Sequence, residues 1–322
     1  MNEFTNSDGT FYALNNELFK REKPLYIQHK TPAKVCYSPD YYTLDMKVPP
    51  TYAHLNQEDP LVLERELFWK YENEYPQILR LMKNRRSLTY SQAELLIKAL
   101  ISIKLRNKFI RDEYMGEQHQ KMIQQIFSDD LIATVYDTKK HYPQFTDKEI
   151  VDAIGSVKIR ATSDPEFIKM LHLTGLIDRE RNPQSVINAA AKKFLNCKWL
   201  IVESDFSATF VTTDNPGYCV DSNDVVHNVK LADCTLVFPL TPLLCLMISD
   251  KVPDPDIQSN ILKKRLEYRQ VDSAMINSIN SSSLYYFSRY IFAQTSQTLN
   301  SISSMVTLAN KKNLQHSCLK KA

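Results

Sequence analysis

Glycine is scarce in this chain, with five residues among 322. The loops that hold the phosphates of dinucleotides and nucleoside triphosphates need several closely spaced glycines, because side chains would keep the backbone away from the phosphate. The sequence has no such run. It therefore predicts no nucleotide cofactor of either class.

The signature motifs of several enzyme classes are also missing. There is no His-Glu-x-x-His, no Gly-x-Ser-x-Gly and no Cys/His zinc spacing, and the seven histidines are scattered singly. The six cysteines form no Cys-x-x-Cys pair and mostly lie in apolar runs, where cysteine behaves as a small hydrophobe. These absences exclude the familiar motif-bearing hydrolases, and they predict reduced, structural cysteines.

The net charge is close to zero, at +3 for 40 basic and 37 acidic side chains. A chain with this balance has no overall electrostatic field that attracts nucleic acid or an anionic membrane. It is still compatible with a basic patch on one face. No stretch is long and apolar enough to span a bilayer, and Met1–Asn6 lacks the basic and apolar parts of a leader peptide. We therefore expect a cytoplasmic protein without a membrane partner.

The composition, 43% hydrophobic and 24% charged, is enough to bury a sizeable core. Changes of pattern divide the chain into an N-terminal β segment packing on the main sheet (1–58), a helical region (59–196), β-hairpins plus a long helix (197–310) and a polar tail (311–322). The sequence predicts one integrated α+β domain. In it, a central helical bundle packs on a C-terminal antiparallel sheet, with a small N-terminal β-hairpin.

Turn and cap signals place the individual elements. Asp8-Gly9 is typical of a hairpin turn, Pro60 suits the start of a helix, and Ser87–Gln92 offers a cap for a long helix towards Gly116. Further helices are expected at about 118–137, 146–159, 164–173 and 183–196.

Two β-hairpins are expected in the last part of the chain. The first joins Lys198–Glu203 to Ala208–Thr213, and the second joins Thr235–Phe238 to Leu243–Ile248. Next, Asp254 is expected to cap a long helix that runs to about Asn280. A returning strand at Tyr290–Ala293 completes the pattern.

Polar residues stand where the second expected strand ends, at Thr213-Asp-Asn-Pro216. Asp214 and Asn215 prefer turns, because their short side chains bond nearby backbone amides, and Pro216 forces the preceding residue out of the helical region. One reading is an Asx-turn that only stops the strand. The other is a candidate site, with Asp214 as its reactive carboxylate and Thr213 and Asn215 as binding groups.

Charged residues inside otherwise apolar helices are the candidates to face this strand end, because their burial demands partners. Glu64 and Glu72 lie two turns apart on one helix, and Arg106 follows the run from Ala99 to Leu105, with Arg111 further on. A carboxylate–guanidinium network under Asp214 is one interpretation. The alternative is a solvated face of ion pairs, each contributing about 0–1 kcal/mol.

The two expected hairpins, in this order, resemble the domain of unknown function 4238 family. Its mostly bacterial members carry a Thr/Ser-Asp-Asn-Pro strand end followed by a Phe-Pro-Leu-Ser/Thr-Pro connection, here Thr213–Pro216 and Phe238–Pro242. The resemblance extends across the chain and is strongest from Trp199 to Leu243. Members typically begin with His-Tyr-x-Pro-x-Phe before the Asp-Gly hairpin, whereas this chain opens at Met1-Asn-Glu-Phe4. The resemblance therefore implies a truncated start, and it supplies no activity.

Three classes of function stay open. The first is a metal- or acid/base-dependent hydrolase, a nuclease acting as a toxin or anti-phage effector. In it, Asp214 and Glu64 are the general-base or metal-binding carboxylates, for Mg²⁺ or Mn²⁺, and Arg106 holds an anionic group of a nucleic acid.

The second class is a binding module, in which Asp214, Asn215, Arg106 and Arg111 contact a small polar or anionic ligand, with Thr213 and Glu72 as further binding residues. In a variant of this class the aromatic groups at Tyr41-Tyr42 and Tyr285–Phe287 grip a protein partner. The third class is a structural or interaction protein without catalysis, whose polar cluster pins the helices to the sheet. In that case Asp214→Ala loses stability rather than activity.

Overall fold

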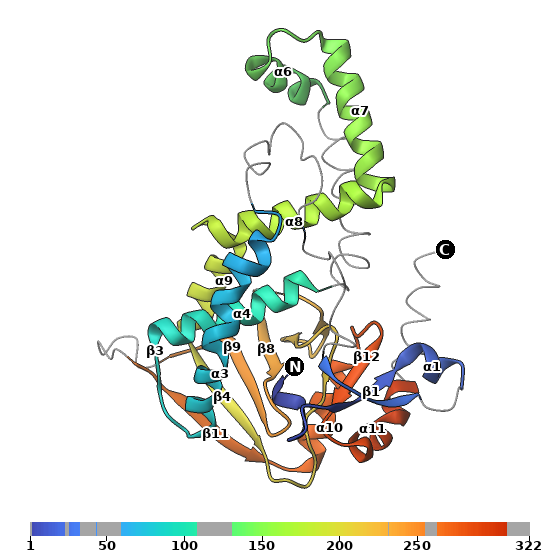
Figure 1. The fold of residues 1–322 in the computed structure, drawn as a ribbon. Helices are drawn as coiled ribbons and strands as arrows, with labels where there is room; N and C mark the ends of the chain where they lie inside the picture. The colour runs from blue at the N-terminus through green and yellow to red at the C-terminus, as the bar shows by residue number, and fades with distance from the viewer. Residues whose placement is uncertain are drawn as a thin grey trace.

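The computed structural model describes residues 2–22, 26–32, 43, 59–107, 131–230, 232–254 and 263–307. Within these ranges the protein is a mixed α+β fold with an N-terminal hairpin, which confirms the predicted fold class. Figure 1 shows a layer of helices over a large sheet, with a smaller sheet beside it. No helix in these ranges is both long enough and apolar enough to cross a membrane.

Several predicted features lie outside the described residues. They are Arg111, Tyr41, Tyr42, the first part of the helix expected at 118–137, and the tail at 311–322.

The main sheet has six strands in the order β11-β4-β9-β8-β6-β7. Their bounds are Cys197–Ser204 (β4), Tyr218–Asp221 (β6), Val226–His227 (β7), Cys234–Pro239 (β8), Leu244–Pro253 (β9) and Leu266–Val271 (β11). Every neighbouring pair is antiparallel except β11 and β4, which run parallel. The predicted antiparallel arrangement therefore holds for all pairs but one.

Of the two predicted hairpins, the second is confirmed and the first is wrong. Strands β8 and β9 pair from Thr235↔Ser249 to Pro239↔Cys245. Strand β4 pairs with β9 and β11, whereas β5 (Thr212–Thr213) joins another sheet. The physical reason is burial, because β4 carries apolar side chains on both faces. A central position between two long strands buries more of this apolar surface than pairing with a short hairpin partner would.

The smaller sheet joins the two ends of the described chain. Its order is β2-β1-β12-β5, with bounds Ile27–Lys30 (β2), Phe11–Asn15 (β1) and Tyr290–Ala293 (β12). The predicted returning strand is thus confirmed, and the N-terminal hairpin is formed by β1 and β2. Around this sheet lie η1 (Asn2–Phe4), α1 (Asn16–Lys20), α10 (Ser273–Ser283) and α11 (Ser296–Ser301).

The predicted long helix after Asp254 is wrong. The segment contains β10 (Lys263–Lys264), β11 and α10. The Asp254 carboxylate forms an ion pair with the fully buried Lys264. Instead Asp272 caps α10 by accepting a hydrogen bond of 3.0 Å from the Met275 N–H. Pairing of β11 with β4 overrides the local helical pattern.

The helical layer begins with a π-helix, η3 (Leu63–Phe68). It continues directly into α3 (Trp69–Lys83). A short strand β3 (Leu88–Thr89) precedes α4 (Tyr90–Arg106), which starts at a capping box made by Thr89 and Gln92. The later helices are α6 (Leu131–His141), α7 (Asp147–Ser163), α8 (Pro165–Arg181) and α9 (Val186–Leu195).

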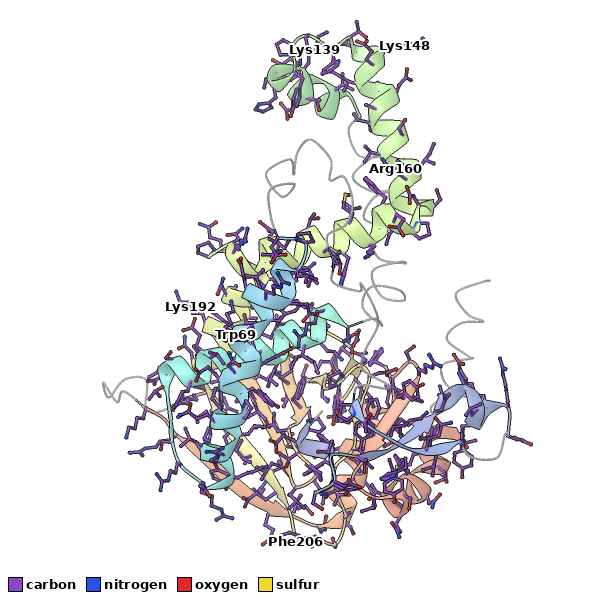
Figure 2. All side chains as sticks on the ribbon, in the orientation of Figure 1. Trp69, Lys139, Lys148, Arg160, Lys192 and Phe206 are labelled. Atoms are coloured by element: carbon purple, nitrogen blue, oxygen red, sulfur yellow. The ribbon has the colours of Figure 1, made fainter. Side chains whose placement is uncertain are left out.

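Helices α6 and α7 extend away from the rest of the molecule (Figure 1). An ion pair between Lys139 and Asp147 links the two helices. Figure 2 shows Lys139, Lys148 and Arg160 on this extension, whereas Trp69 and Phe206 lie on the body, where their side chains are exposed.

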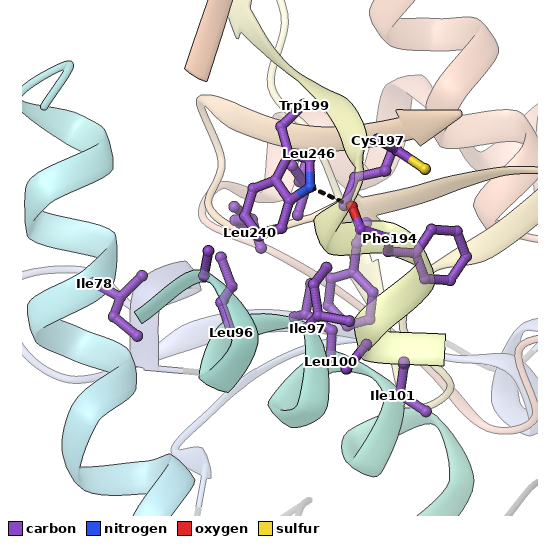
Figure 3. Close-up of a cluster of buried hydrophobic side chains, with 14 of the residues drawn as sticks. Ile78, Leu96, Ile97, Leu100, Ile101, Phe194, Cys197, Trp199, Leu240 and Leu246 are labelled. Atoms are coloured by element: carbon purple, nitrogen blue, oxygen red, sulfur yellow. Dashed lines mark hydrogen bonds between the residues drawn. The ribbon is translucent and has the colours of Figure 1, made fainter. Parts of the chain in front are cut away.

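The largest core cluster lies between the helical layer and the main sheet. Helices α4 and α9 bring Leu96, Ile97, Leu100 and Phe194 onto Trp199 of β4. The Trp199 indole N–H donates a hydrogen bond of 2.9 Å to the Phe194 carbonyl oxygen (Figure 3). Each fully buried side chain of this kind contributes about 1.5–3 kcal/mol. This core fixes α4 above the strands and so positions the candidate site at its C-terminal end.

Candidate functional site

Asp214 follows β5 and is tied to the start of β12. Its Oδ1 accepts the Ser288 N–H at 3.0 Å, and its Oδ2 accepts the N–H groups of Arg289 and Tyr290 at 2.6 and 3.0 Å. Its own N–H donates to the Tyr290 carbonyl oxygen at 3.1 Å. Burial raises the pKa of Asp214, and the three backbone N–H groups oppose that shift. The half-buried carboxylate is thus an anchor for the backbone of residues 288–290.

Asn215 is the centre of a buried network between the turn and α4. Its Nδ2 donates to Asn228 Oδ1 at 2.9 Å and to the Tyr286 carbonyl oxygen at 2.7 Å. Its Oδ1 accepts from Lys104 Nζ at 2.7 Å and from Asn107 Nδ2 at 2.9 Å. All four hydrogen-bonding positions of the carboxamide are therefore filled.

Thr213 supports the same turn from its N-terminal side. Its side chain is buried, and its Oγ1 accepts the Asn215 N–H at 3.2 Å. A hydroxyl that bonds a backbone N–H two residues on is a typical turn contact. Thr213, Asp214 and Asn215 thus all contribute to fixing the strand end.

Lys104 is a site residue that the sequence reading missed. It interrupts the apolar run from Ala99 to Leu105, and that interruption was the available signal. Its Nζ donates to Asn215 Oδ1 at 2.7 Å and to the Gly217 carbonyl oxygen at 2.6 Å. Burial lowers the pKa of Lys104 to about 7, while Cys219 and Asp214 act in the opposite direction. A buried amino group therefore joins α4 to the strand end.

A small cavity of about 20 Å³ lies beside Lys104. Asn228 and Gly217 also line it. The Asn228 Nδ2 atom is buried without a hydrogen-bond partner among the described residues.

A second polar group lies where η3 and α3 meet the C-terminal end of α4. The Arg106 guanidinium forms an ion pair with Glu72 Oε1 at 3.4 Å and lies 4.3 Å from the centre of the Phe68 ring. Partial burial raises the pKa of Glu64, Arg106 lowers it and Glu72 raises it. The structure therefore brings Glu64, Glu72 and Arg106 together.

The structure does not add Asp214 to this group. The charged neighbours that shift the pKa of Glu64 are Arg106 and Glu72, and the Asp214 oxygens are taken up by backbone N–H groups. The part of the chain that the structure describes also contains no group of three or more His, Cys, Asp or Glu side chains able to hold a metal ion. The two carboxylates thus face different partners, and the expected pairing of Asp214 and Glu64 around Mg²⁺ or Mn²⁺ stays a prediction.

Glu180 of α8 extends the acidic group and was also missed. Its Oε2 accepts from the Tyr71 hydroxyl at 2.5 Å and pairs with Lys70 Nζ at 3.2 Å. Its side chain is 2% exposed, and its Oε1 has no hydrogen-bond partner in the described ranges. Burial and the Glu180 carboxylate raise the pKa of Tyr71. The charges of Glu180 and Arg106 both act on Tyr71, so this pair lies next to the Glu64 group.

Comparison with known proteins gives one decisive match. The model of the family described as "Protein of unknown function (DUF4238)" matches residues 2–297. The chain belongs to this family. The match to DUF4238 includes both the Asp214 turn and the Glu64 group, and the family description states no activity. Searches of curated proteins and of solved structures found no match.

Proposed function

We propose that this DUF4238 protein is an acid/base hydrolase that acts on an anionic substrate, with a phosphodiester of nucleic acid as the first candidate. The proposed reactive group is Glu64 with Arg106 and Glu72. The observation that carries the proposal is the placement of Glu64 on a π-helical turn, beside a guanidinium at the end of α4.

The π-helix is the first support for a functional role. Helical turns of this kind are rare, cost backbone hydrogen-bond quality and occur frequently at functional sites. Here the turn spans Leu63–Phe68 and leads directly into α3. Leu63, Leu67 and Phe68 are buried, while Glu64 and Glu66 face solvent. The buried side chains of this turn thus fix the backbone that carries the Glu64 carboxylate at the surface.

The electrostatics of Glu64 suit a general base. A general base is most efficient when its pKa is raised towards the working pH. Partial desolvation raises the pKa of Glu64, Arg106 opposes that shift and Glu72 adds to it, and the net direction is upward. In the proposed reaction Glu64 takes a proton from the attacking water as the water oxygen bonds to phosphorus. The P–O bond to one sugar oxygen breaks, and that oxygen receives the proton back from Glu64, so the products are an alcohol and a phosphomonoester. Arg106 binds the anionic oxygens of the substrate, because a planar guanidinium recognises phosphate with two parallel N–H bonds.

The Arg106–Glu72 ion pair can yield to a substrate. Its 3.4 Å separation exceeds the roughly 2.7–2.9 Å of a strong charge-assisted hydrogen bond. Phe68 holds the guanidinium from its face, so the cation stays in place when Glu72 is exchanged for a phosphate. A nuclease with this site would act as a toxin or anti-phage effector.

Divalent metal fits this group poorly. Arg106 already supplies a positive charge next to Glu64 and Glu72, and this charge repels a second cation at the same two carboxylates. We therefore derive no step through a metal. The proposal gives a structural role to the turn, which holds the C-terminal end of α4. The residues concerned are Thr213, Asp214, Asn215 and Lys104.

The test is a cleavage assay on single-stranded DNA, duplex DNA and RNA, with Mg²⁺, with Mn²⁺ and with EDTA. Wild type is compared with Glu64→Gln, and Glu66→Gln is the control because Glu66 lies on the same π-helix and pairs with Arg181 at 3.6 Å. We expect cleavage that Glu64→Gln lowers by roughly 10²–10⁴-fold and Glu66→Gln leaves intact. Equal activity of both variants, or no cleavage of any polymer by wild type, would count against the proposal.

A further inference from the structure

An open pocket of about 420 Å³ lies on the smaller sheet, apart from the Glu64 group. Its lining residues come from β1, the segment at β2, and α11: Tyr12, Tyr26, Ile27, His29, Ser296 and Asn300. Pockets for small ligands span about 300–1,000 Å³, so this one is large enough for a single ring system.

The aromatic walls of the pocket are held in place by the strand pairing. Tyr12 and His29 are direct cross-strand partners in β1 and β2, and their ring centres are 4.8 Å apart at an interplanar angle of 36°. Tyr26 packs edge-on against Phe19, with ring centres 5.1 Å apart. Rings fixed in this way lose little conformational freedom when a ligand binds.

His29 is also held by a hydrogen-bond chain. Its Nε2 lies 2.6 Å from Thr10 Oγ1, and Thr10 bonds the Asp8 carboxylate through its hydroxyl and, at 3.0 Å, through its backbone N–H. The chain orients the imidazole ring next to Tyr12. The pocket therefore presents a preformed π surface.

The polar groups of the pocket come from α11. Ser296 offers a hydroxyl and Asn300 a carboxamide, so donors and acceptors are both present, while no Asp, Glu, Lys or Arg is among the lining residues. Such a site suits a flat, neutral ligand with donors and acceptors on its edge. A carboxamide matches the paired donor and acceptor on the edge of a nucleobase.

We propose that this pocket binds a nucleobase, stacked on the Tyr12–His29 pair and hydrogen-bonded at its edge by Asn300. Stacking on aromatic side chains is the usual way in which proteins hold unpaired bases. This proposal stands apart from the proposed hydrolase activity, because binding is measured without turnover and at a different place on the molecule.

The experiment is a saturation-transfer NMR titration of the full chain with adenosine, guanosine, cytidine and uridine, with ribose and glucose as reference ligands. We expect saturable binding of at least one nucleoside, with transfer strongest to the base protons, and no binding of ribose. Binding of glucose alone, or of no nucleoside, would overturn the proposal.

Variants locate the binding site. Tyr12→Leu should weaken nucleoside binding by about tenfold or more, because the stacking partner is lost, and Asn300→Ala should weaken it by roughly fivefold. Ser304→Ala, on an exposed residue near α11 and outside the lining, is the matched control and should bind as wild type does. Tyr12 also packs on a core cluster, so the thermal unfolding midpoint of the Tyr12→Leu variant is measured as well. If that variant unfolds, Asn300→Ala tests the proposal, because Asn300 is exposed. Unchanged affinity in Asn300→Ala together with a folded, fully binding Tyr12→Leu would contradict the assignment.

Discussion

Lys104 Nζ donates a hydrogen bond of 2.7 Å to Asn215 Oδ1, so a buried contact between two side chains joins α4 to the Asp-Asn-Pro turn. Arg106 stands two residues further along α4 and pairs with Glu72. The turn is therefore bonded to the same helix that carries Arg106. The residues of the turn and Lys104 therefore have a structural role, whereas Glu64, Glu72 and Arg106 form the proposed reactive group. Mutations in the first set should lower stability, and mutations in the second should lower activity.

Loss of the Asp214 carboxylate should destabilise the fold. Asp214→Asn replaces one carboxylate oxygen by an amide donor, so at least one of the three backbone N–H groups loses its acceptor and meets a second donor, which costs about 1–3 kcal/mol. We expect the free energy of unfolding, measured by urea denaturation, to fall by roughly 1–3 kcal/mol. Asp205→Asn is the control, since Asp205 bonds its own exposed loop. A variant as stable as wild type would show that these bonds do not anchor β12.

Lys104 should make stability depend on pH. Its pKa is lowered from 10.5 to about 7 in the folded state, so between these values the unfolded chain binds the additional proton. Its contribution to stability is therefore fully present above pH 10.5 and is lost as the pH falls through 7. The free energy of unfolding should rise by roughly 3–5 kcal/mol from this group across that window.

The comparison for Lys104 uses methionine variants. Lys104→Met should flatten the rise in stability between pH 7 and 10. Lys98→Met should keep it, because Lys98 lies on the same helix but pairs with Glu94 at the surface. Parallel stability curves for wild type and Lys104→Met would show that the lysine is charged in both the folded and the unfolded state throughout this range.

Gly217 should tolerate no side chain. Its φ is +74°, and an added Cβ would lie 2.4 Å from Cδ2 of the Phe238 ring. Gly217→Ala combines a strained backbone with overpacking, and we expect a loss of roughly 2–4 kcal/mol in chemical denaturation. Gly155→Ala is the opposite case. That glycine lies inside α7 with open space around its Cβ position, so alanine should stabilise the helix by about 0.5–1 kcal/mol. Equal effects of the two substitutions would refute this account.

The sequence predicted those parts of the fold that local patterns determine. The second hairpin was readable because β8 and β9 are apolar runs on either side of a short connection that contains Pro242. The first was misread because β5 contains only Thr212 and Thr213, too few residues to specify a partner, and its pairing with β12 depends on residues far along the chain. Choice of strand partner is a long-range effect that periodicity does not encode.

The sequence likewise predicted part of the candidate site, namely the residues that local spacing identifies. Helical spacing placed Glu64 and Glu72 on one face, and an apolar run followed by a charge singled out Arg106. Lys104 was passed over, because a lysine at one position of such a run looks like a surface residue until its acceptors, Asn215 Oδ1 and Gly217 O, are known. The role of Asp214 depended on backbone N–H groups of residues 288–290, which no side-chain pattern reveals.

The most direct test of the proposed reactive group is the pH dependence of kcat/KM for nucleic-acid cleavage. If Glu64 is the general base, the rate should rise with pH through an apparent pKa above the ordinary value of a glutamate, and Glu64→Gln should abolish this rise. Because Arg106 lowers the pKa of Glu64, Arg106→Gln should move the rise to higher pH in addition to weakening substrate binding. A rise that persists unchanged in Glu64→Gln would contradict the assignment of Glu64 as the base.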